Sequence, residues 1–308
     1  MVSQLSTGMI IRNFQNEDFS LLGELYQAVT SKENATFWWV GEEANWSNVY
    51  CAFENGKMVA KGQVSIITII PPGRSAANKH SIYLNLKALP ERDNDFDLLE
   101  NVYQHLFLRA LQVKETLPSE YQTMLCVGND SSEVENNRFF IQKGYTHWNS
   151  LFQMKRDLLE PIPALTLDEN FHFSYWKMES AQEEKDYLDL EATIWPDAPL
   201  GFERLSEYKN KALWTSMVIR QNDTIAASLM AWQEEKVGVV EDVFVQEPWR
   251  KRGLAKFLLT QALGYLKSHE LKSAYLMVET TNETALSLYK SVGFEVDKEE
   301  IRYYMVLK

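Results

Sequence analysis

The sequence predicts a mixed α/β (α+β) protein built as two similar halves, and three observations support this. The chain has 308 residues, enough for roughly two ordinary domains. Runs typical of strands alternate with runs typical of helices, which favours helices layered on sheets. A stretch with Pro161 and Pro163 divides the chain almost in half and has no regular periodicity. We therefore expect domains in residues 1–160 and 170–308, joined by a linker at 161–169.

The two halves repeat one order of elements. Each begins with a strand, a helix and a hairpin, continues with a strand and a helix, and closes with a strand, a short helix, a Gly-aromatic pair and a last strand. In the first half the landmarks are Ile10–Phe14, Asp18–Val29, Tyr50–Phe53, Met58–Ile70, Ser81–Leu86, Asp97–Val113, Met124–Val127 and Gly144-Tyr145. In the second they are Phe171–Trp176, Ala181–Ile194, Thr215–Arg220, Thr224–Trp232, Val237–Val245, Leu254–Ser268, Ala274–Glu279 and Gly293-Phe294. This parallel order favours an internal duplication over two unrelated domains.

Local patterns justify the individual elements. Leu21 and Leu25 recur at helical spacing in the first helix. Asn55-Gly56 lies between two β-rich runs, which is a hairpin signature. Pro248 ends the strand that closes at Val245, because proline has no N–H for the ladder.

Composition excludes several classes of protein. There are 31 Lys and Arg against 43 Asp and Glu, a net charge of −12. This argues against a nucleic-acid binder and an anionic membrane surface, and it suits cationic substrates. Two cysteines, Cys51 and Cys126, cannot form a disulfide framework, so we expect reduced thiols in a cytoplasmic protein. The N-terminal segment has no apolar run behind a basic start, and the run near Val64–Pro72 is too short to span a membrane.

The most informative segment is Val237–Ala255, in which a β-rich run leads through a turn into a helix. Gly253 and the small Ala255 let the backbone approach a ligand closely. Successive N–H groups at a helix start attract anions, so a pyrophosphate would fit. Three cations surround the turn: Arg250, Lys251 and Arg252. The alternative is a plain strand-to-helix turn with a solvated basic run.

Two motifs in order resemble those of the GCN5-related N-acetyltransferase (GNAT) superfamily. The residues that match its acyl-CoA-binding motif are Val243, Val245, Arg250, Gly253 and Ala255. The second motif, Asn282–Phe294, has the family pattern of Asn, Ala, Leu-Tyr and Gly-Phe. The resemblance is clear over Thr215–Lys308. The sequence departs from the family at Ala255, where Gly is commonest, and at Lys251, where Gly is frequent.

The resemblance implies two tandem GNAT folds, each a mixed, mostly antiparallel, splayed sheet flanked by helices. It implies acetyl-CoA as cosubstrate, with the pantetheine arm paired to the backbone at Val243, Phe244 and Val245. One of these amides would polarise the thioester carbonyl. The pyrophosphate would be held by the amides of Arg252, Gly253, Leu254 and Ala255, beside the charges of Arg250 and Lys251. Asn282 would contact the CoA arm.

An amine acceptor needs a base, since it is mostly protonated at neutral pH. Glu241 and Asp242 precede Val243, and strand alternation would turn one toward the cleft and the other away. The sequence does not decide between them, and both could be polar residues near a sheet end. The resemblance makes Tyr289 the acid that protonates the CoA thiolate, with helix packing as its alternative role. No metal-ligand spacing is present, and no cysteine lies near the motifs.

The first half is expected to be a degenerate copy. Its counterpart of the phosphate turn, Lys87–Asp97, has no glycine and carries several acids that would repel a pyrophosphate. Counting back from Gly144 as from Gly293 places Phe140 opposite Tyr289, so the hydroxyl is missing.

These observations predict an acetyl-CoA-dependent N-acetyltransferase that acts on an amine, with a small molecule favoured, by direct attack in a ternary complex. An acceptor at a protein N-terminus or lysine is the alternative within this class. A non-catalytic CoA-binding sensor or interaction module is the alternative outside it.

Overall fold

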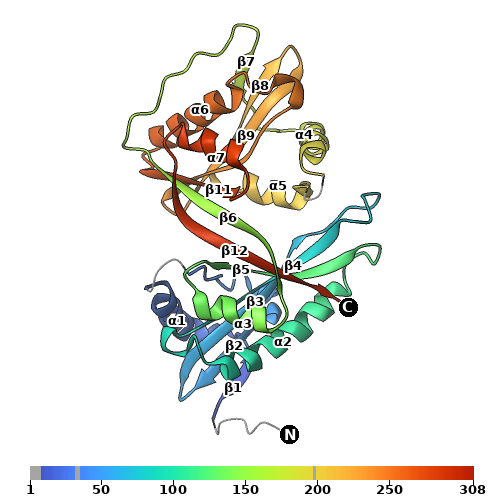
Figure 1. Ribbon diagram of the computed structural model, residues 1–308, viewed down its shortest axis with the longest axis vertical. Helices are drawn as coiled ribbons and strands as arrows, with labels where there is room; N and C mark the ends of the chain where they lie inside the picture. The colour runs from blue at the N-terminus through green and yellow to red at the C-terminus, as the bar shows by residue number, and fades with distance from the viewer. Residues whose placement is uncertain (1–7, 32–34, 197–198) are drawn as a thin grey trace. The chain divides into compact units, whose positions relative to one another are not determined.

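The computed structural model describes residues 8–31, 35–196 and 199–308. Its contacts divide the chain into two compact units (Figure 1). Unit 1 is Met1–Ser150 with Glu300–Lys308, and unit 2 is Leu151–Glu299. Residues 1–7, at which the sequence predicts no secretory signal, lie outside the described part.

Unit 1 is a sheet covered on both faces by helices. Its strands, in spatial order, are β1 (Ile10–Asn13), β2 (Val49–Glu54), β3 (Lys57–Thr68), β4 (Lys79–Ala88), β5 (Gln122–Asp130) and the end of β12 (Glu295–Leu307). Only β4 and β5 run parallel among these neighbours. The helices are η1 (Asn16–Asp18), α1 (Phe19–Ser31), η2 (Glu43–Asn48), η3 (Pro90–Arg92), α2 (Phe96–Lys114) and α3 (Val134–Gln142). Residues of α1 belong to one apolar core, and residues of α2 and α3 belong to another.

Unit 2 repeats this plan. Its strands, in spatial order, are β6 (Thr146–Asp157), β11 (Ser273–Glu279), β10 (Val237–Val245), β9 (Thr224–Glu234), β8 (Ala212–Gln221) and β7 (His172–Tyr175). The parallel pair is β10 with β11. The helices are α4 (Ala181–Ile194), α5 (Gly201–Lys209), η4 (Glu247–Trp249), α6 (Leu254–Ser268) and α7 (Glu283–Lys290). Here α6 and α7 share a core on one face, and α4 and α5 share a core on the other.

The predicted mixed, mostly antiparallel and splayed sheets are confirmed. In unit 2, β10 pairs with β11 only at Gly238 and Val239, although β10 continues to Val245. In unit 1, β4 pairs with β5 only as far as Leu84, although β4 continues to Ala88. Each parallel pair therefore opens toward its carboxyl ends, and this opening positions the site described below.

The last strands are exchanged between the halves of the sequence. Leu151–Asp157 of β6 pairs with β11 of unit 2, and Glu300–Leu307 of β12 pairs with β5 of unit 1. The contacts thus divide at Ser150 and Glu299, which differs from the predicted boundaries of 1–160 and 170–308. The reason is that the linker predicts where the chain lacks regular structure, whereas hydrogen-bonded pairing decides which unit a strand completes.

Candidate active site

A β-bulge interrupts β10 where it opens from β11. Glu241 pairs with Met230 of β9 and Phe244 with Ser228, so β10 gains one residue at this point. Asp242 takes up the extra length in the left-handed region, with φ of 52°. A bulge takes backbone groups out of the ladder, which makes them available to a ligand.

The turn after β10 ends in a helix start that no side chain caps. Gly253 is the N-cap of α6 at φ 77°, and as a glycine it has no side chain to accept a hydrogen bond from the first-turn amides. A Cβ at Gly253 would meet nothing within 4 Å, so glycine is required here by the backbone conformation and not by crowding. Arg250, Lys251 and Arg252 are exposed beside these amides. The residues present therefore fit an anionic group such as a pyrophosphate.

The bulge corrects one expectation about the two carboxylates. Alternation predicts that Glu241 and Asp242 point to opposite faces. Glu241 lies opposite Met230, which belongs to the core under α4 and α5. Asp242 accepts hydrogen bonds from the Tyr187 hydroxyl and from Trp195 Nε1, the latter at 2.9 Å, and both partners belong to α4 or its C-cap. Both carboxylates therefore lie on the face of the sheet that α4 and α5 cover, because the positive φ of Asp242 breaks the alternation.

The two carboxylates differ in their surroundings. Burial raises the pKa of Asp242, and its two hydrogen bonds only partly offset this. Glu241 lies among tyrosines: burial first, and then its charge, raise the pKa of Tyr208 and of Tyr289 to about 12. Glu241 and Tyr289 are therefore close enough to interact, and the hydroxyl of Tyr289 keeps its proton at neutral pH.

Tyr289 and Asn282 both lie on α7. Tyr289 is buried and makes an edge contact with Phe294, their ring centres being 6.2 Å apart. Asn282 is the exposed N-cap of α7, and its Oδ1 accepts the Ala285 N–H at 3.1 Å. Capping alone accounts for an asparagine at this position, and it leaves the side-chain amide N–H groups for a ligand.

Sequence reasoning missed the wall that α5 contributes. Tyr208 of α5 stacks on Trp232 of β9 at 4.5 Å between ring centres, and Arg204 donates to the Tyr208 hydroxyl at 3.0 Å. The buried Trp232 Nε1 has no hydrogen-bond partner in the described part of the chain, so a bound molecule could accept from it. The spacing of Leu205 and Tyr208 in the run Gly201–Lys209 is the signal that could have revealed this helix.

Cys51 and Cys126 are free and buried, and burial raises the pKa of each thiol to about 12. In the described ranges, no group of three His, Cys, Asp or Glu is placed to hold a metal ion. No described helix is both long and apolar enough to cross a membrane.

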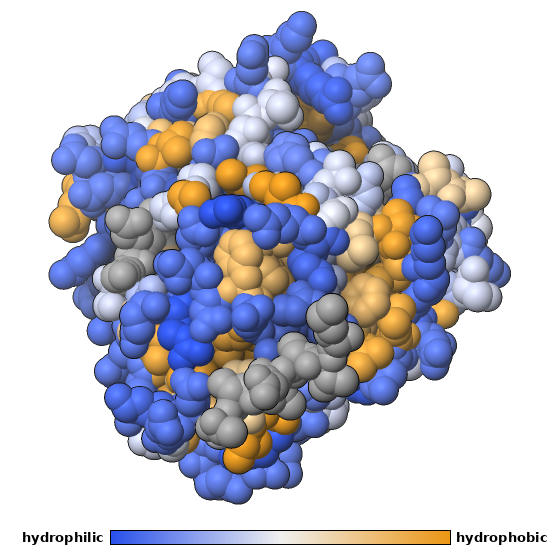
Figure 2. All heavy atoms as spheres, turned by 60° about the horizontal axis from the view of Figure 1, so that its bottom comes forward, coloured by the Kyte–Doolittle hydropathy of each residue, from blue (hydrophilic) through white to orange (hydrophobic). Residues whose placement is uncertain are grey.

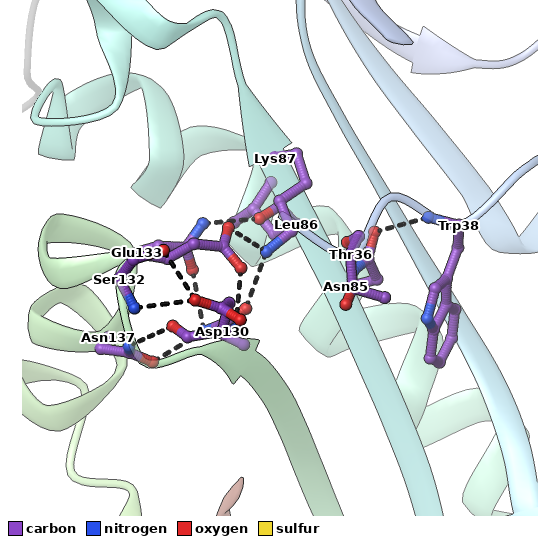
Figure 3. Close-up of polar contacts among 11 residues, drawn as sticks. Thr36, Trp38, Asn85, Leu86, Lys87, Asp130, Ser132, Glu133 and Asn137 are labelled. Atoms are coloured by element: carbon purple, nitrogen blue, oxygen red, sulfur yellow. Dashed lines mark hydrogen bonds and ion pairs between the residues drawn. The ribbon is translucent and has the colours of Figure 1, made fainter. Parts of the chain in front are cut away.

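The equivalent region of unit 1 is built differently. Counting from Gly144 and Gly293 makes Glu133 the counterpart of Asn282. The pairings with β3 and β9 make Lys87 the counterpart of Phe244, because the extra residue of the bulge lies before Phe244. The β4 ladder runs straight past Lys87, which pairs with Lys61 of β3 without a bulge. Lys87 is buried and ion-paired to Glu133 (Figure 3). A charged pair thus lies where unit 2 has Phe244 and a neutral cap.

Comparison with known proteins gives a family match over most of unit 2. Residues 175–294 match the family model described as Acetyltransferase (GNAT) family. A mycothiol acetyltransferase of Thermobispora bispora is 28% identical over 165 residues, which is 49% of this chain and 55% of that protein. A mycothiol acetyltransferase of Acidothermus cellulolyticus is 25% identical over 175 residues, 53% of that protein. The chain thus spans about half the length of such relatives, or less.

Solved structures extend the likeness to the whole chain. A GCN5-related N-acetyltransferase from Sphaerobacter thermophilus superposes with a TM-score of 0.74 at 18% identity, covering 98% of this chain and 96% of that one. A tandem GNAT protein from the clavulanic acid biosynthesis pathway gives 0.69 at 11% identity, covering 97% and 98%. At these identities the likeness shows the fold. Residues 175–294 therefore match the GNAT family, and the whole chain has the fold of tandem GNAT proteins.

Proposed function

We propose that the protein is an N-acetyltransferase that moves an acetyl group from acetyl-CoA to an amine, with unit 2 carrying the reaction. The observation that supports this most is the opening of β10 from β11 beside the bulge at Asp242, together with the charge of Glu241 acting on Tyr289. In unit 1, β4 has no bulge between Asn85 and Lys87, the residues equivalent to Glu241 and Phe244.

The backbone of unit 2 would hold the cosubstrate. Amides of Val243, Phe244 and Val245 would pair with the pantetheine arm, and one of them would stabilise the charge that develops on the thioester oxygen. The uncapped first turn of α6, residues 252–255, would bind the pyrophosphate, with the neighbouring cations increasing its attraction. Asn282 would donate its side-chain amide to the CoA arm.

We assign the base to Glu241 and the acid to Tyr289. The amine nitrogen forms a bond to the carbonyl carbon, the C–S bond breaks, Glu241 accepts the amine proton and Tyr289 gives a proton to the thiolate. Glu241 is preferred to Asp242 because its charge reaches Tyr289. Asp242 is held by Tyr187 and Trp195, which suits a residue that positions the bulge.

A small amine is the favoured acceptor. Aromatic rings of α4, α5 and β9 lie on the same face of the sheet as the carboxylates of Glu241 and Asp242. Carboxylates and aromatic rings both attract organic cations. The relatives named as mycothiol acetyltransferases support an acceptor of small size.

The decisive experiment is thiol release from acetyl-CoA with a panel of small amines and with peptides that carry a free N-terminus or a lysine. We expect turnover with at least one small amine, and a Tyr289→Phe variant with a lower kcat. Turnover on peptides alone would show that the acceptor is a protein and not a small amine. Saturable CoA binding without any turnover would show that the protein is a CoA sensor and not an enzyme. An unchanged kcat in Tyr289→Phe would show that Tyr289 is not the general acid.

A further inference from the structure

Unit 1 contains a cavity of about 400 Å³ at the place where β4 and β5 separate. Its lining comes from the end of β4, from the turn that follows it and from the start of α3. Asn85 helps to shape this region by tying Thr36 and Trp38 to β4 through hydrogen bonds of 2.8 and 3.2 Å (Figure 3). The volume is in the range of small-molecule sites in proteins.

One wall of the cavity is a cluster of polar groups that hydrogen-bond to one another. The Lys87 ammonium donates to Asn129 Oδ1 at 2.9 Å and to Glu133. The second oxygen of Glu133 accepts the Asp130 N–H at 3.0 Å. Lys87 is therefore already neutralised, and the carboxylate of Glu133 lies at the N-terminal end of α3. An anion entering here would have to displace Glu133 from a buried partner, which is costly.

The rest of the lining is apolar or acidic. Val29 and Leu99 are buried apolar walls, and Asp93 and Glu135 add two carboxylates. Glu135 has only a 3.5 Å contact with the exposed Arg138, and Asp93 has no ion pair in the described part of the chain. Figure 2 shows apolar patches set among hydrophilic residues on the face that it presents. The uncompensated charge of the cavity is thus negative, beside an apolar surface.

We propose that this cavity binds a small organic cation, an amine with an apolar body, and that it does not bind acyl-CoA. The apolar part would contact Val29 and Leu99, and the ammonium would face Asp93 and Glu135. This site lies within unit 1 and does not depend on the reaction proposed for unit 2.

Three ligands of one shape test the charge preference by calorimetry on the full chain. Tryptamine is the cation, tryptophol the neutral analogue and indole-3-acetate the anion. We expect tryptamine to bind at least about tenfold more tightly than either analogue, which corresponds to about 1.4 kcal/mol, and to weaken as salt is raised. Equal binding of the three ligands, tighter binding of indole-3-acetate, or no binding of tryptamine at millimolar concentration would overturn the proposal.

Variants locate the binding. Asp93→Asn combined with Glu135→Gln should weaken tryptamine about tenfold and leave tryptophol unchanged. Val134→Trp should obstruct the cavity, because Val134 lines it and is 64% exposed, so the fold tolerates a larger side chain. Ile141→Trp is the matched control, since it lies on the same helix, is 53% exposed and does not line the cavity. Tryptamine binding that survives both cavity variants would place the amine elsewhere and refute the assignment.

Discussion

The end of β4 in unit 1 and the end of β10 in unit 2 are equivalent in the fold but opposite in chemistry. In β10 a bulge interrupts the ladder, and Phe244 and Asn282 leave the opening uncharged. In β4 the ladder is straight, and Lys87 and Glu133 occupy the two equivalent positions as an ion pair. The two strand ends therefore differ in both backbone shape and charge, and the proposed cosubstrate suits only the bulged, uncharged one.

The largest expected effect is on the reaction rate, and it comes from replacing Glu241, the proposed base beside the bulge. Glu241→Gln should lower kcat/KM by roughly 10²–10⁴, because a positioned base contributes rate factors of this size. Asp242→Asn is the matched control and should cost less in rate but more in thermal stability, since Asp242 joins β10 to Tyr187 and Trp195. Steady-state kinetics and thermal melts of both variants measure this. A larger rate loss in Asp242→Asn would transfer the base role to Asp242.

The buried ion pair offers a direct exchange between the copies. Glu133→Asn alone should destabilise unit 1 by about 3–5 kcal/mol, because it leaves the Lys87 charge buried without its partner. Adding Lys87→Phe, so that both positions carry the residues of unit 2, should remove the unpaired charge and recover part of that loss. Hydrogen exchange of β4 and β5 amides reports on unit 1 separately. A double variant as unstable as Glu133→Asn would show that the cost is not the unpaired charge.

The cations of the turn Arg250–Ala255, which we propose binds the pyrophosphate, should affect binding of the cosubstrate and not the chemical step. Replacing Lys251 and Arg252 by Ser should raise the KM for acetyl-CoA by about tenfold, with kcat nearly unchanged, and the effect should shrink at high salt. The exposed Lys185 lies on α4, and Lys185→Ser is the control. A fall in kcat with constant KM would contradict a role in pyrophosphate binding.

The most gradual effect concerns Lys61, the buried lysine that pairs with Lys87 across β3 and β4. Burial lowers its pKa to about 7 from 10.5. The unfolded chain therefore binds more protons between these values, and the free energy of unfolding should rise with pH across that window, by at most about 1.4 kcal/mol per pH unit. Lys61→Met should remove this rise. Denaturant titrations from pH 7 to pH 10 measure it, and parallel pH profiles for the two proteins would show that Lys61 does not titrate there.

Much of the fold could be read from local patterns. The predicted helices Ala181–Ile194 and Leu254–Ser268 and the strand Val237–Val245 have the same bounds in the structure. Their apolar periodicity reflects which side is buried, and that is a local property of the chain. The helix Gly201–Lys209 was missed because it is short and its apolar residues are few.

The candidate site could be predicted only in part. The motif around Gly253 is continuous in sequence, so its turn and helix start were foreseen. The face of the sheet on which Asp242 lies could not be predicted, because alternation assumes a regular strand and the bulge adds a residue. Tyr208 and Trp232 reach the site from separate elements, and no spacing in the sequence joins them.

The sequence alone establishes the duplication, the GNAT motifs of the second half and the loss of the glycine turn in the first, because each is written in contiguous residues. Folding in three dimensions decides that the last strands change places, that Glu241 and Asp242 share a face, and that Lys87 meets Glu133. These features depend on pairing between residues far apart in the chain, where hydrogen bonding and burial select the partner and local propensity does not.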